Sequence, residues 1–391
     1  MVVKVGDVAG LRTAEGVAAL AAVAAGDADP LVVSARLRAA GHDPALVTAA
    51  LTQQRLRQRA AGKFGPDAAR MFFTADGVEQ ATRMAVATRR AARLAAAGAR
   101  TLVDLGCGVG ADLVAFARAG IAVTGIERDP VTAAAAAANI EELGLTQLAT
   151  VRCADATEVD LRPFDAAFCD PARRSNGRRL FDPDAYAPPW RFLLSVAAGV
   201  PLTAVKVAPG IGHGLIPDGV EAEWVSDHYE VVEAALWFGP LAAVTHRATV
   251  LPAGFCLTGS GRRTAPVGPV REFLYDPDGA VVRAHLVAEL ADAIGGTLVD
   301  PTIAYLCTDQ PMPTPFARGY RVTDVLPFSV KRLRALLRER GVGTVTVKKR
   351  GSAVMPEEMR RQLKLSGDAA ATVVLTRVAG APTALVCQPV E

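Results

Sequence analysis

A glycine-rich loop at the end of an apolar run is the part of the chain best suited to hold a ligand. It reads Asp104-Leu105-Gly106-Cys107-Gly108-Val109-Gly110 and closes the apolar run over residues 101–105. Glycines at a strand-to-helix turn let the backbone approach a ligand closely and direct N–H groups toward it. The spacing Gly106-x-Gly108-x-x-Ala111 also fits the dinucleotide fingerprint, so the loop alone leaves the ligand open.

Three acidic residues near successive strand ends favour a cationic nucleoside. Asp104 precedes the glycines, where a carboxylate would repel a pyrophosphate but attract the ammonium group of methionine. Glu127 ends the second apolar run, where it could accept both ribose hydroxyls, and Asp155 follows the third, where it could accept the adenine amino group. Such strand ends converge on one crevice in a doubly wound sheet. The sequence therefore predicts S-adenosylmethionine as the cofactor, with an NAD(P)-binding domain, or a nucleotide-free domain whose acids cap helices, as alternatives. The predicted cofactor-binding residues are Asp104, Gly106, Cys107, Gly108, Gly110, Glu127, Arg128, Asp155, Ala156 and Asp170.

The fourth apolar run leads into a candidate acceptor motif, Asp170-Pro171-Ala172-Arg173-Arg174. Amino-directed methyltransferases commonly carry Asp or Asn, two prolines and an aromatic residue here, and the first side chain holds the nucleophilic nitrogen. Methyl transfer gains chiefly from that orientation. Asp170 and Pro171 fit this motif, but no aromatic residue follows. Arg173 would therefore either stack on a base in place of the aromatic ring or bind a phosphate. We predict Asp170, Pro171 and Arg173 as catalytic; alternatively, Asp170 caps the next turn and the arginines are solvated.

Several other charged residues surround this motif in the sequence. Arg174, with Arg178 and Arg179 close behind it, adds positive charge that suits a phosphate-rich acceptor. Lys206 interrupts an apolar fifth run, so it either faces the crevice or pairs with a carboxylate. His213 and His228 have no partner motif and are expected to be ordinary loop or strand residues.

Positive charge is concentrated near the C-terminus. Residues 318–364 hold 13 Lys and Arg against four Asp and Glu, a local balance of +9 in a chain of net charge +3. Lys331, Arg334 and Arg338 share one face of a predicted helix because positions three and four apart are neighbours. Lys348-Lys349-Arg350 ends a predicted strand. Such a surface favours RNA binding through phosphates; the alternative is a solvated basic face.

The periodicity predicts three domains in the 391 residues. Residues 1–95 show helical spacing, notably at 32–51 and 78–94. Residues 96–257 alternate short apolar runs with helix-length segments, which predicts a parallel sheet covered on both faces and finished by an antiparallel hairpin over 230–238 and 245–251. Residues 258–391 begin with a linker at 258–270 and continue as a small α/β domain, with helices at 281–293, 329–340 and 356–363 and strands at 344–348 and 372–377.

Composition excludes several classes of protein. The six cysteines are scattered with no CxxC pair, so neither a disulfide framework nor a zinc site is expected, and we predict no metal and a cytoplasmic location. No apolar stretch reaches the roughly 20 residues that a membrane helix needs. The abundance of Ala and Arg over Lys indicates a GC-rich bacterial genome. The sequence predicts no particular oligomeric state.

The motifs together resemble the bacterial class I methyltransferases with a C-terminal THUMP-like domain. The resemblance spans about residues 30–380 and rests on Asp104-Leu105-Gly106-Cys107-Gly108, the distinctive Asp170-Pro171-Ala172-Arg173-Arg174 and Val347-Lys348-Lys349-Arg350-Gly351, and shorter pieces: Lys63-Phe64-Gly65, Phe73-Thr74, Glu79-Gln80-Ala81-Thr82-Arg83 and Ala317-Arg318-Gly319. It implies a Rossmann-like seven-stranded sheet, S-adenosylmethionine binding at residues 104–110, Glu127 and Asp155, and transfer at Asp170. THUMP domains present tRNA in related enzymes, so the resemblance also implies an RNA acceptor.

We therefore expect a methyltransferase that modifies a base nitrogen of tRNA or rRNA at Asp170-Pro171, with the N-terminal helices capping the crevice. Arg174, Lys206, Lys331, Arg334, Arg338, Lys348, Lys349 and Arg350 are the predicted RNA-binding residues. The alternatives are a small-molecule methyltransferase and a non-catalytic module that binds S-adenosylmethionine and RNA.

Overall fold

The computed structural model describes residues 3–25, 29–171, 174–175, 178–179 and 186–390. The chain forms two compact units. Unit 1 comprises residues 1–207, 217–220 and 235–243, and unit 2 comprises residues 208–216, 221–234 and 244–391. The division into three domains at residues 95 and 257 stays a prediction.

The N-terminal part of unit 1 is helical, as its apolar spacing predicts. Its helices are α1 Val5–Leu11, α2 Ala14–Ala24, α3 Pro30–Ala39, α4 Pro44–Phe64, α5 Ala75–Gln80 and α6 Met84–Ala96. Side chains cap four of the helix starts: Thr13, Asp29, Asp43 and Thr74 each accept a backbone N–H from the first turn. Among the described residues, no helix is long and apolar enough to cross a membrane.

A Rossmann-like sheet follows. Its elements are β1 Thr101–Leu105, α7 Ala111–Arg118, β2 Ala122–Glu127, α8 Pro130–Glu142, β3 Ala149–Cys153, β4 Ala166–Cys169, α9 Trp190–Gly199, β7 Leu202–Val207, β8 Glu221–Asp227, β9 Glu230–Trp237, β10 His246–Leu251 and β11 Phe255–Gly259. The strand order is β11-β10-β8-β9-β7-β4-β1-β2-β3, so two strands extend the expected seven. Strands β3, β2, β1, β4 and β7 are parallel neighbours. The chain order reverses between β1 and β4, and this switch point is where such sheets bind ligands.

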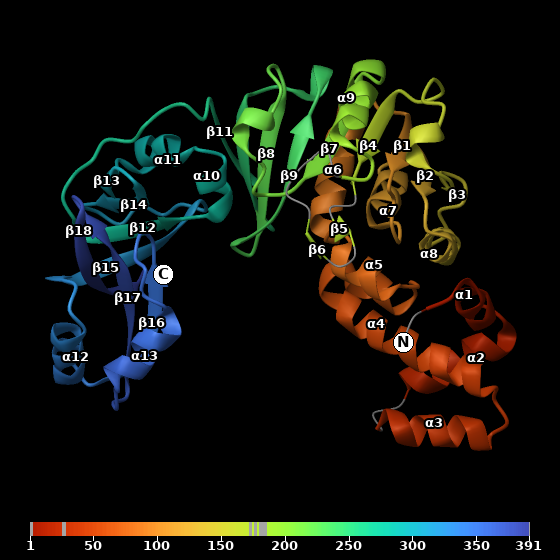
Figure 1. Ribbon diagram of the computed structural model, residues 1–391, viewed down its shortest axis with the longest axis horizontal. Helices are drawn as coiled ribbons and strands as arrows, with labels where there is room; N and C mark the ends of the chain where they lie inside the picture. Colours follow the sequence, from red (N-terminus) through yellow and green to blue (C-terminus); the bar gives the residue numbers. More distant parts are fainter. Residues whose placement is uncertain (1–2, 26–28, 172–173, 176–177, 180–185, 391) are drawn as a thin grey trace. The chain divides into compact units, whose positions relative to one another are not determined.

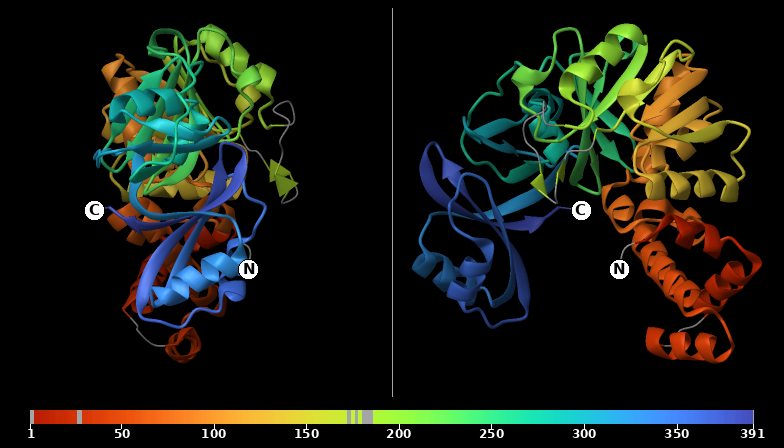
Figure 2. Two further views of the ribbon diagram at one scale, coloured as in Figure 1. Left: turned by 90° about the vertical axis from the view of Figure 1, so that its left-hand side faces the viewer. Right: turned by 45° about the vertical axis from the view of Figure 1, so that its right-hand side comes forward.

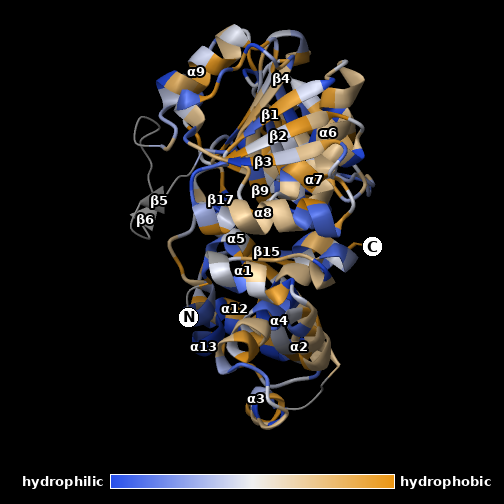
Figure 3. Ribbon diagram, turned by 90° about the vertical axis from the view of Figure 1, so that its right-hand side faces the viewer, coloured by the Kyte–Doolittle hydropathy of each residue, from blue (hydrophilic) through white to orange (hydrophobic). Residues whose placement is uncertain are grey.

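Helices cover both faces of the parallel strands. Apolar residues of α6 and α7 share one core with β1, β2, β4 and β7. In Figure 3, α6 and α7 lie on one side of these strands and α9 on the other. A second core joins the N-terminal helices to α8 through Val8, Leu11, Leu20, Ala135 and Ala138, and Figure 1 shows α1 beside α8. The helical segment is therefore packed on the sheet rather than separate from it.

The predicted hairpin over 230–238 and 245–251 is wrong. Strand β10 pairs in parallel with β8, and β8 lies between β10 and β9. The hairpin is instead β8–β9, closed by His228 and Tyr229, whose φ angles are 51° and 66°, as a two-residue turn requires. Strand β8 escaped the sequence analysis because it carries Glu221 and Glu223. Both are buried, Glu221 pairing with Arg247 (2.7 Å) and Glu223 accepting from the Thr249 hydroxyl.

Unit 2 ends in a second sheet of seven strands, in the order β13-β14-β12-β15-β18-β17-β16. The elements are β12 Phe273–Pro277, α10 Gly279–Arg283, α11 Val287–Ile294, β13 Thr297–Asp300, β14 Ile303–Thr308, β15 Ala317–Pro327, α12 Val330–Glu339, β16 Val342–Lys349, α13 Pro356–Leu363, β17 Ala369–Val378 and β18 Ala381–Pro389. Leu333 and Leu337 of α12 share a core with Met359 and Leu363 of α13 and with β16–β18. Figure 2 shows β15–β18 with α12 and α13 in blue, and β12–β14 in teal.

Three further expectations for this region need correction. The single helix over 281–293 is two helices, because His285 adopts a φ of 58° and ends the first. The strand over 372–377 does not close the domain, since β18 follows it and pairs with both β15 and β17. The predicted linker begins inside β11, which extends to Gly259.

Asn139 joins three parts of unit 1. Its side chain is fully buried on α8; the amide nitrogen donates to the Phe72 (3.0 Å) and Val109 (2.8 Å) carbonyls, and its oxygen accepts from the Phe72 N–H (2.6 Å). Val109 belongs to the glycine loop and Phe72 to the connection between α4 and α5. One amide therefore ties the helical segment to the loop.

Replacing Asn139 by Ala should lower the free energy of unfolding by about 3 kcal/mol, because it leaves buried backbone groups without partners. Urea denaturation followed by circular dichroism measures this. Gln147→Ala, which removes an exposed amide, is the control and should change little. Equal midpoints for the two variants would contradict the role given to Asn139.

Candidate active site

The glycine loop has the backbone conformation that its sequence predicts. Gly106, Gly108 and Gly110 have φ angles of 94°, 55° and 93°, which favour glycine. Gly106 also lies against the end of β4: a Cβ there would be 2.8 Å from the Asp170 carbonyl oxygen. The loop and the acceptor motif therefore meet at the switch point between β1 and β4.

Asp104 is buried near the end of β1, and its carboxylate lacks hydrogen-bond donors within the described residues. Its side chain is 0% exposed, and neither carboxylate oxygen has a hydrogen-bond partner in the part of the chain that the structure describes. Burial raises the pKa of Asp104 well above its ordinary value, and the negative charges of Asp112 and Asp170 raise it further. A buried carboxylate without a donor is costly, so a cationic donor from a ligand would stabilise it.

Two buried residues beside Asp104 were missed by the sequence analysis. Arg90, on α6, forms an ion pair with Asp112, on α7, and lies 4.3 Å from the centre of the Phe168 ring. The positive charge of Arg90 lowers the pKa of Asp104, but this effect is smaller than the rise caused by burial, by Asp112 or by Asp170. A signal was present: Arg90 falls within the apolar stripe of α6 with Val86, Ala87, Ala91 and Leu94.

Glu127 and Asp155 follow neighbouring strands. Glu127 accepts from the backbone N–H of Gly108 (3.1 Å) and Asp129 (2.9 Å), which places its carboxylate against the glycine loop. The end of β3 is held beside it, since the Ala154 N–H donates to the Glu127 carbonyl (3.1 Å). Asp155 caps a short 3-10 helix, Ala156–Glu158, and bonds to Thr157 lower its pKa. If the domain bound no nucleotide, its acids would be expected to cap helices, and Asp155 does so. Glu127, in contrast, faces the glycine loop.

The remaining predicted cofactor residues differ in exposure. Cys107 is buried, its sulfur faces Gly125, where a Cβ would come within 2.8 Å, and burial raises the pKa of its thiol. Gly106, Gly108 and Ala156 are half-buried and Arg128 is exposed. The thiol of Cys107 thus packs inside the loop; Gly110 is also buried, and Gly106 and Gly108 are the loop glycines that stay partly exposed.

Asp170 is held by an ion pair that sequence reasoning left open. The ammonium of Lys206, a side chain only 6% exposed, donates to Oδ2 of Asp170 (2.7 Å) and to the hydroxyl of Thr82 (2.9 Å). Lys206 therefore pairs with a carboxylate. Asp170 keeps 25% of its side chain exposed, and its Oδ1 has no hydrogen-bond partner among the described residues. Pro171 is buried, Arg173 lies outside the described residues, and Arg174 begins the short strand β5 Arg174–Ser175, paired with β6 Arg178–Arg179.

Most of the predicted RNA-binding residues of unit 2 already hold the fold together. Arg334 and Arg338 donate to the carbonyls of Gln362 (2.5 Å) and Lys364 (2.8 Å), which ties α12 to the end of α13. Lys348 and Arg350 both pair with Asp276, at 2.7 and 2.9 Å. Lys331 and Lys349 are exposed. Lys348 and Arg350 are thus paired with a carboxylate, while Arg334 and Arg338 keep their charge, and the role of these residues in RNA binding stays a prediction.

Comparisons with known proteins agree with this arrangement. Family models match a methyltransferase domain at residues 102–175, a THUMP domain-like region at 317–389 and a domain of unknown function at 4–60. Proteins from two strains of Mycobacterium tuberculosis, CDC 1551 and H37Rv, both described as uncharacterized S-adenosylmethionine-dependent methyltransferases, are each 37% identical over 352 residues, covering 85% of this chain and 95% of theirs. A crystal structure from Porphyromonas gingivalis W83, described as a methyltransferase, shares the fold with a TM-score of 0.72 at 19% identity, over 99% of this chain and 98% of that one. The chain therefore belongs to the bacterial class I S-adenosylmethionine-dependent methyltransferases with a C-terminal THUMP-like domain.

Proposed function

We propose that this methyltransferase modifies a base nitrogen of tRNA or rRNA, which Asp170 holds beside the cofactor. The observation that carries the proposal is the state of Asp170: one oxygen is fixed by the buried Lys206, and the other is available on a partly exposed carboxylate. An acceptor N–H that donated to Oδ1 would be oriented by a carboxylate that cannot easily rotate. The THUMP-like region supports RNA as the source of that nitrogen.

The cofactor fits the donors and charges present. S-adenosylmethionine supplies a sulfonium methyl group, and its ammonium is the kind of donor that the buried Asp104 lacks. Asp104, Asp112, Asp170 and Glu127 interact electrostatically around this point and outnumber the cations Arg90 and Lys206. That imbalance disfavours a pyrophosphate, which argues against NAD(P). Glu127 would hold the ribose and Asp155 the adenine, with the half-buried glycines forming the floor.

The chain's contribution to the reaction is mainly orientation. The acceptor nitrogen forms a bond to the methyl carbon while the carbon–sulfur electron pair returns to sulfur, and the nitrogen then loses a proton to solvent. Asp170 would align the nitrogen lone pair through its N–H bond, and alignment of this kind supplies a large part of such rates. Arg173 remains the proposed stacking or phosphate-binding residue. Lys331 and Lys349, both exposed, are the proposed phosphate contacts of the THUMP-like region.

Cofactor affinity should depend on the charge of Asp104. Because the pKa of Asp104 is raised, part of the Asp104 population stays protonated at pH values above its ordinary pKa of 3.8. A cationic ligand needs the ionised form, so affinity should rise with pH through the raised pKa. Calorimetry with S-adenosylhomocysteine over a pH series that starts at the ordinary pKa of 3.8 and runs upward measures this.

Asp104→Asn should lower this affinity by roughly 10- to 100-fold, because it removes a hydrogen bond to a charged group, and should flatten the pH dependence. Asp160→Asn, which neutralises an exposed carboxylate paired with Arg162, is the matched control. Equal affinity and an unchanged pH profile in Asp104→Asn would remove this carboxylate from cofactor binding.

Methyl transfer should depend on Asp170, whereas cofactor binding should not. Asp170→Ala, which removes the acceptor oxygens altogether, should reduce methyl incorporation into RNA from a deletion strain by at least about 100-fold, with cofactor affinity within a few-fold of wild type. Mass spectrometry of nucleosides from that strain should show one methylated base missing, restored by wild type but not by Asp170→Ala. A complete set of RNA nucleosides in the deletion strain would favour a small-molecule acceptor. Full turnover by Asp170→Ala would reject the proposed role.

Lys206 should act as a positioning residue for Asp170. Lys206→Gln should lower kcat by roughly 10- to 100-fold, since small misplacements cost that much, and leave the cofactor dissociation constant within a few-fold. Lys206→Arg, which keeps the charge, should recover part of the loss. A change confined to cofactor affinity, with kcat intact, would contradict this role.

A further inference from the structure

Unit 2 contains a stack of three aromatic rings that the proposed reaction does not use. The rings belong to Trp224 on β8, His213 in the short 3-10 helix His213–Leu215, and His285 in the turn between α10 and α11. His213 lies parallel to both neighbours, with centroid distances of 5.0 Å to Trp224 and 3.8 Å to His285 and interplanar angles of 16° and 11°. We call these three residues the ring stack.

Hydrogen bonds fix the inner rings of the stack. The indole N–H of Trp224, which is fully buried, donates to the Pro209 carbonyl (3.0 Å), and Nε2 of His213 donates to the Arg283 carbonyl (3.0 Å). Burial lowers the pKa of His213, and the neighbouring His285 lowers it further, so the middle ring is held neutral. The two inner rings therefore form a rigid, uncharged base for the stack.

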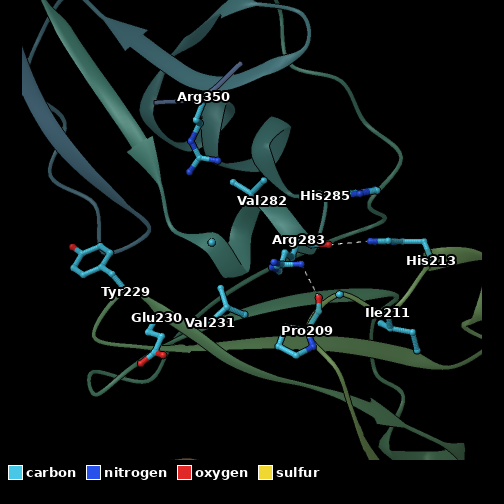
Figure 4. Close-up of a pocket in the computed structure, with 12 residues that line it drawn as sticks. Pro209, Ile211, His213, Tyr229, Glu230, Val231, Val282, Arg283, His285 and Arg350 are labelled. Carbon is cyan, nitrogen blue, oxygen red and sulfur yellow. Dashed lines mark hydrogen bonds between the residues drawn. The ribbon is translucent and has the colours of Figure 1, made fainter. Parts of the chain in front are cut away.

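The outer ring lies at one edge of a hollow. His285 is exposed, and no described ring stacks on its second face. It lines a hollow of about 730 Å³ together with Arg283, Arg350, Tyr229, Glu230 and small apolar residues including Val231 and Val282. Figure 4 shows His285 and Arg283 on one side of this hollow and Tyr229 on the other. The hollow lies within the usual size range of small-molecule and cofactor sites.

Arg283, which lines the hollow, and Arg318, which lies on the lining residue Tyr229, add positive charge. The Arg283 guanidinium is exposed and donates through Nη1 to the Pro209 carbonyl (3.2 Å); it has no further hydrogen-bond partner among the described residues. Arg318 lies 4.0 Å from the centre of the Tyr229 ring, so Tyr229 is a second planar group with a cation on it. Exposed arginines beside aromatic faces are typical of single-stranded nucleic acid sites.

We propose that this hollow binds one nucleotide of a single-stranded RNA segment, with the base stacked on the outer face of His285 and a phosphate on Arg283. The inference rests on the proposed RNA acceptor and adds a second contact point to it. The base would continue the ring stack as its fourth member. A mixed lining of this kind suits a nucleotide better than an inorganic polyanion.

The backbone at His285 allows a clean test. His285 adopts a φ of 58°, which asparagine tolerates, so His285→Asn removes the ring without added backbone strain. His285→Phe keeps a stacking ring and removes the polar nitrogens. His228 is a matched control: it also has a positive φ, of 51°, it is exposed, and no aromatic ring contacts it among the described residues.

Binding of the full-length protein to a labelled single-stranded RNA octamer, measured by fluorescence anisotropy, tests the proposal. His285→Asn should weaken binding by about 5- to 100-fold, the usual effect of losing one stacked base, whereas His285→Phe and His228→Asn should stay within about three-fold. Arg283→Gln should weaken binding and lower the salt dependence by about one phosphate contact. Adenosine monophosphate, added as a competitor, distinguishes a free nucleotide from an RNA segment.

Equal affinity of His285→Asn and wild type for the octamer would overturn the proposal. Tight, His285-dependent binding of the mononucleotide with no binding of the octamer would overturn the assignment to RNA. The proposed function is judged separately, by the nucleosides of the deletion strain. If wild type restores the missing nucleoside while His285→Asn binds RNA normally, the proposed RNA-binding role of the hollow is wrong and the proposed RNA methyltransferase function stands.

Discussion

The buried carboxylate of Asp104 is the constraint on which the proposed chemistry depends. It lies at the end of the central strand β1, fully enclosed, with no donor among the described residues. Because its pKa is raised by burial and by neighbouring acids, the folded state favours the protonated form, and ionisation toward neutral pH destabilises the ligand-free fold. A cation at this point offsets that cost. The acids that we propose to select a sulfonium nucleoside are thus also the ones that the fold alone leaves unbalanced.

The sequence predicted the parts of the fold that rest on periodicity and glycine chemistry. Apolar runs located β1, β2, β3, β4 and β7, and the cofactor loop has the positive φ angles that its glycines indicate. Strand β8 was missed because its two buried glutamates resemble a polar loop. Their partners, Arg247 and Thr249, lie on β10, and cross-strand pairing of this kind has no local signal.

In the candidate site, too, the sequence did not reveal which residues become partners across strands. Sequence placed Asp104, Glu127, Asp155 and Asp170 at successive strand ends, but it could not show that Lys206 donates to Asp170 from another strand. Counting charge along the chain also could not show which cations of the THUMP-like region are paired. Lys348 and Arg350 pair with the carboxylate of Asp276, whereas Arg334 and Arg338 donate to backbone carbonyls and keep their charge. The ring stack, built from residues far apart in sequence, gave no signal at all.

A crystal structure of the complex with S-adenosylhomocysteine tests the central claim most directly. The account predicts that the ligand ammonium donates to a carboxylate oxygen of Asp104 at about 3 Å and that Glu127 accepts from the ribose hydroxyls. A ligand whose ammonium lies away from Asp104, or a crevice closed by the protein's own side chains with no ligand bound, would contradict it.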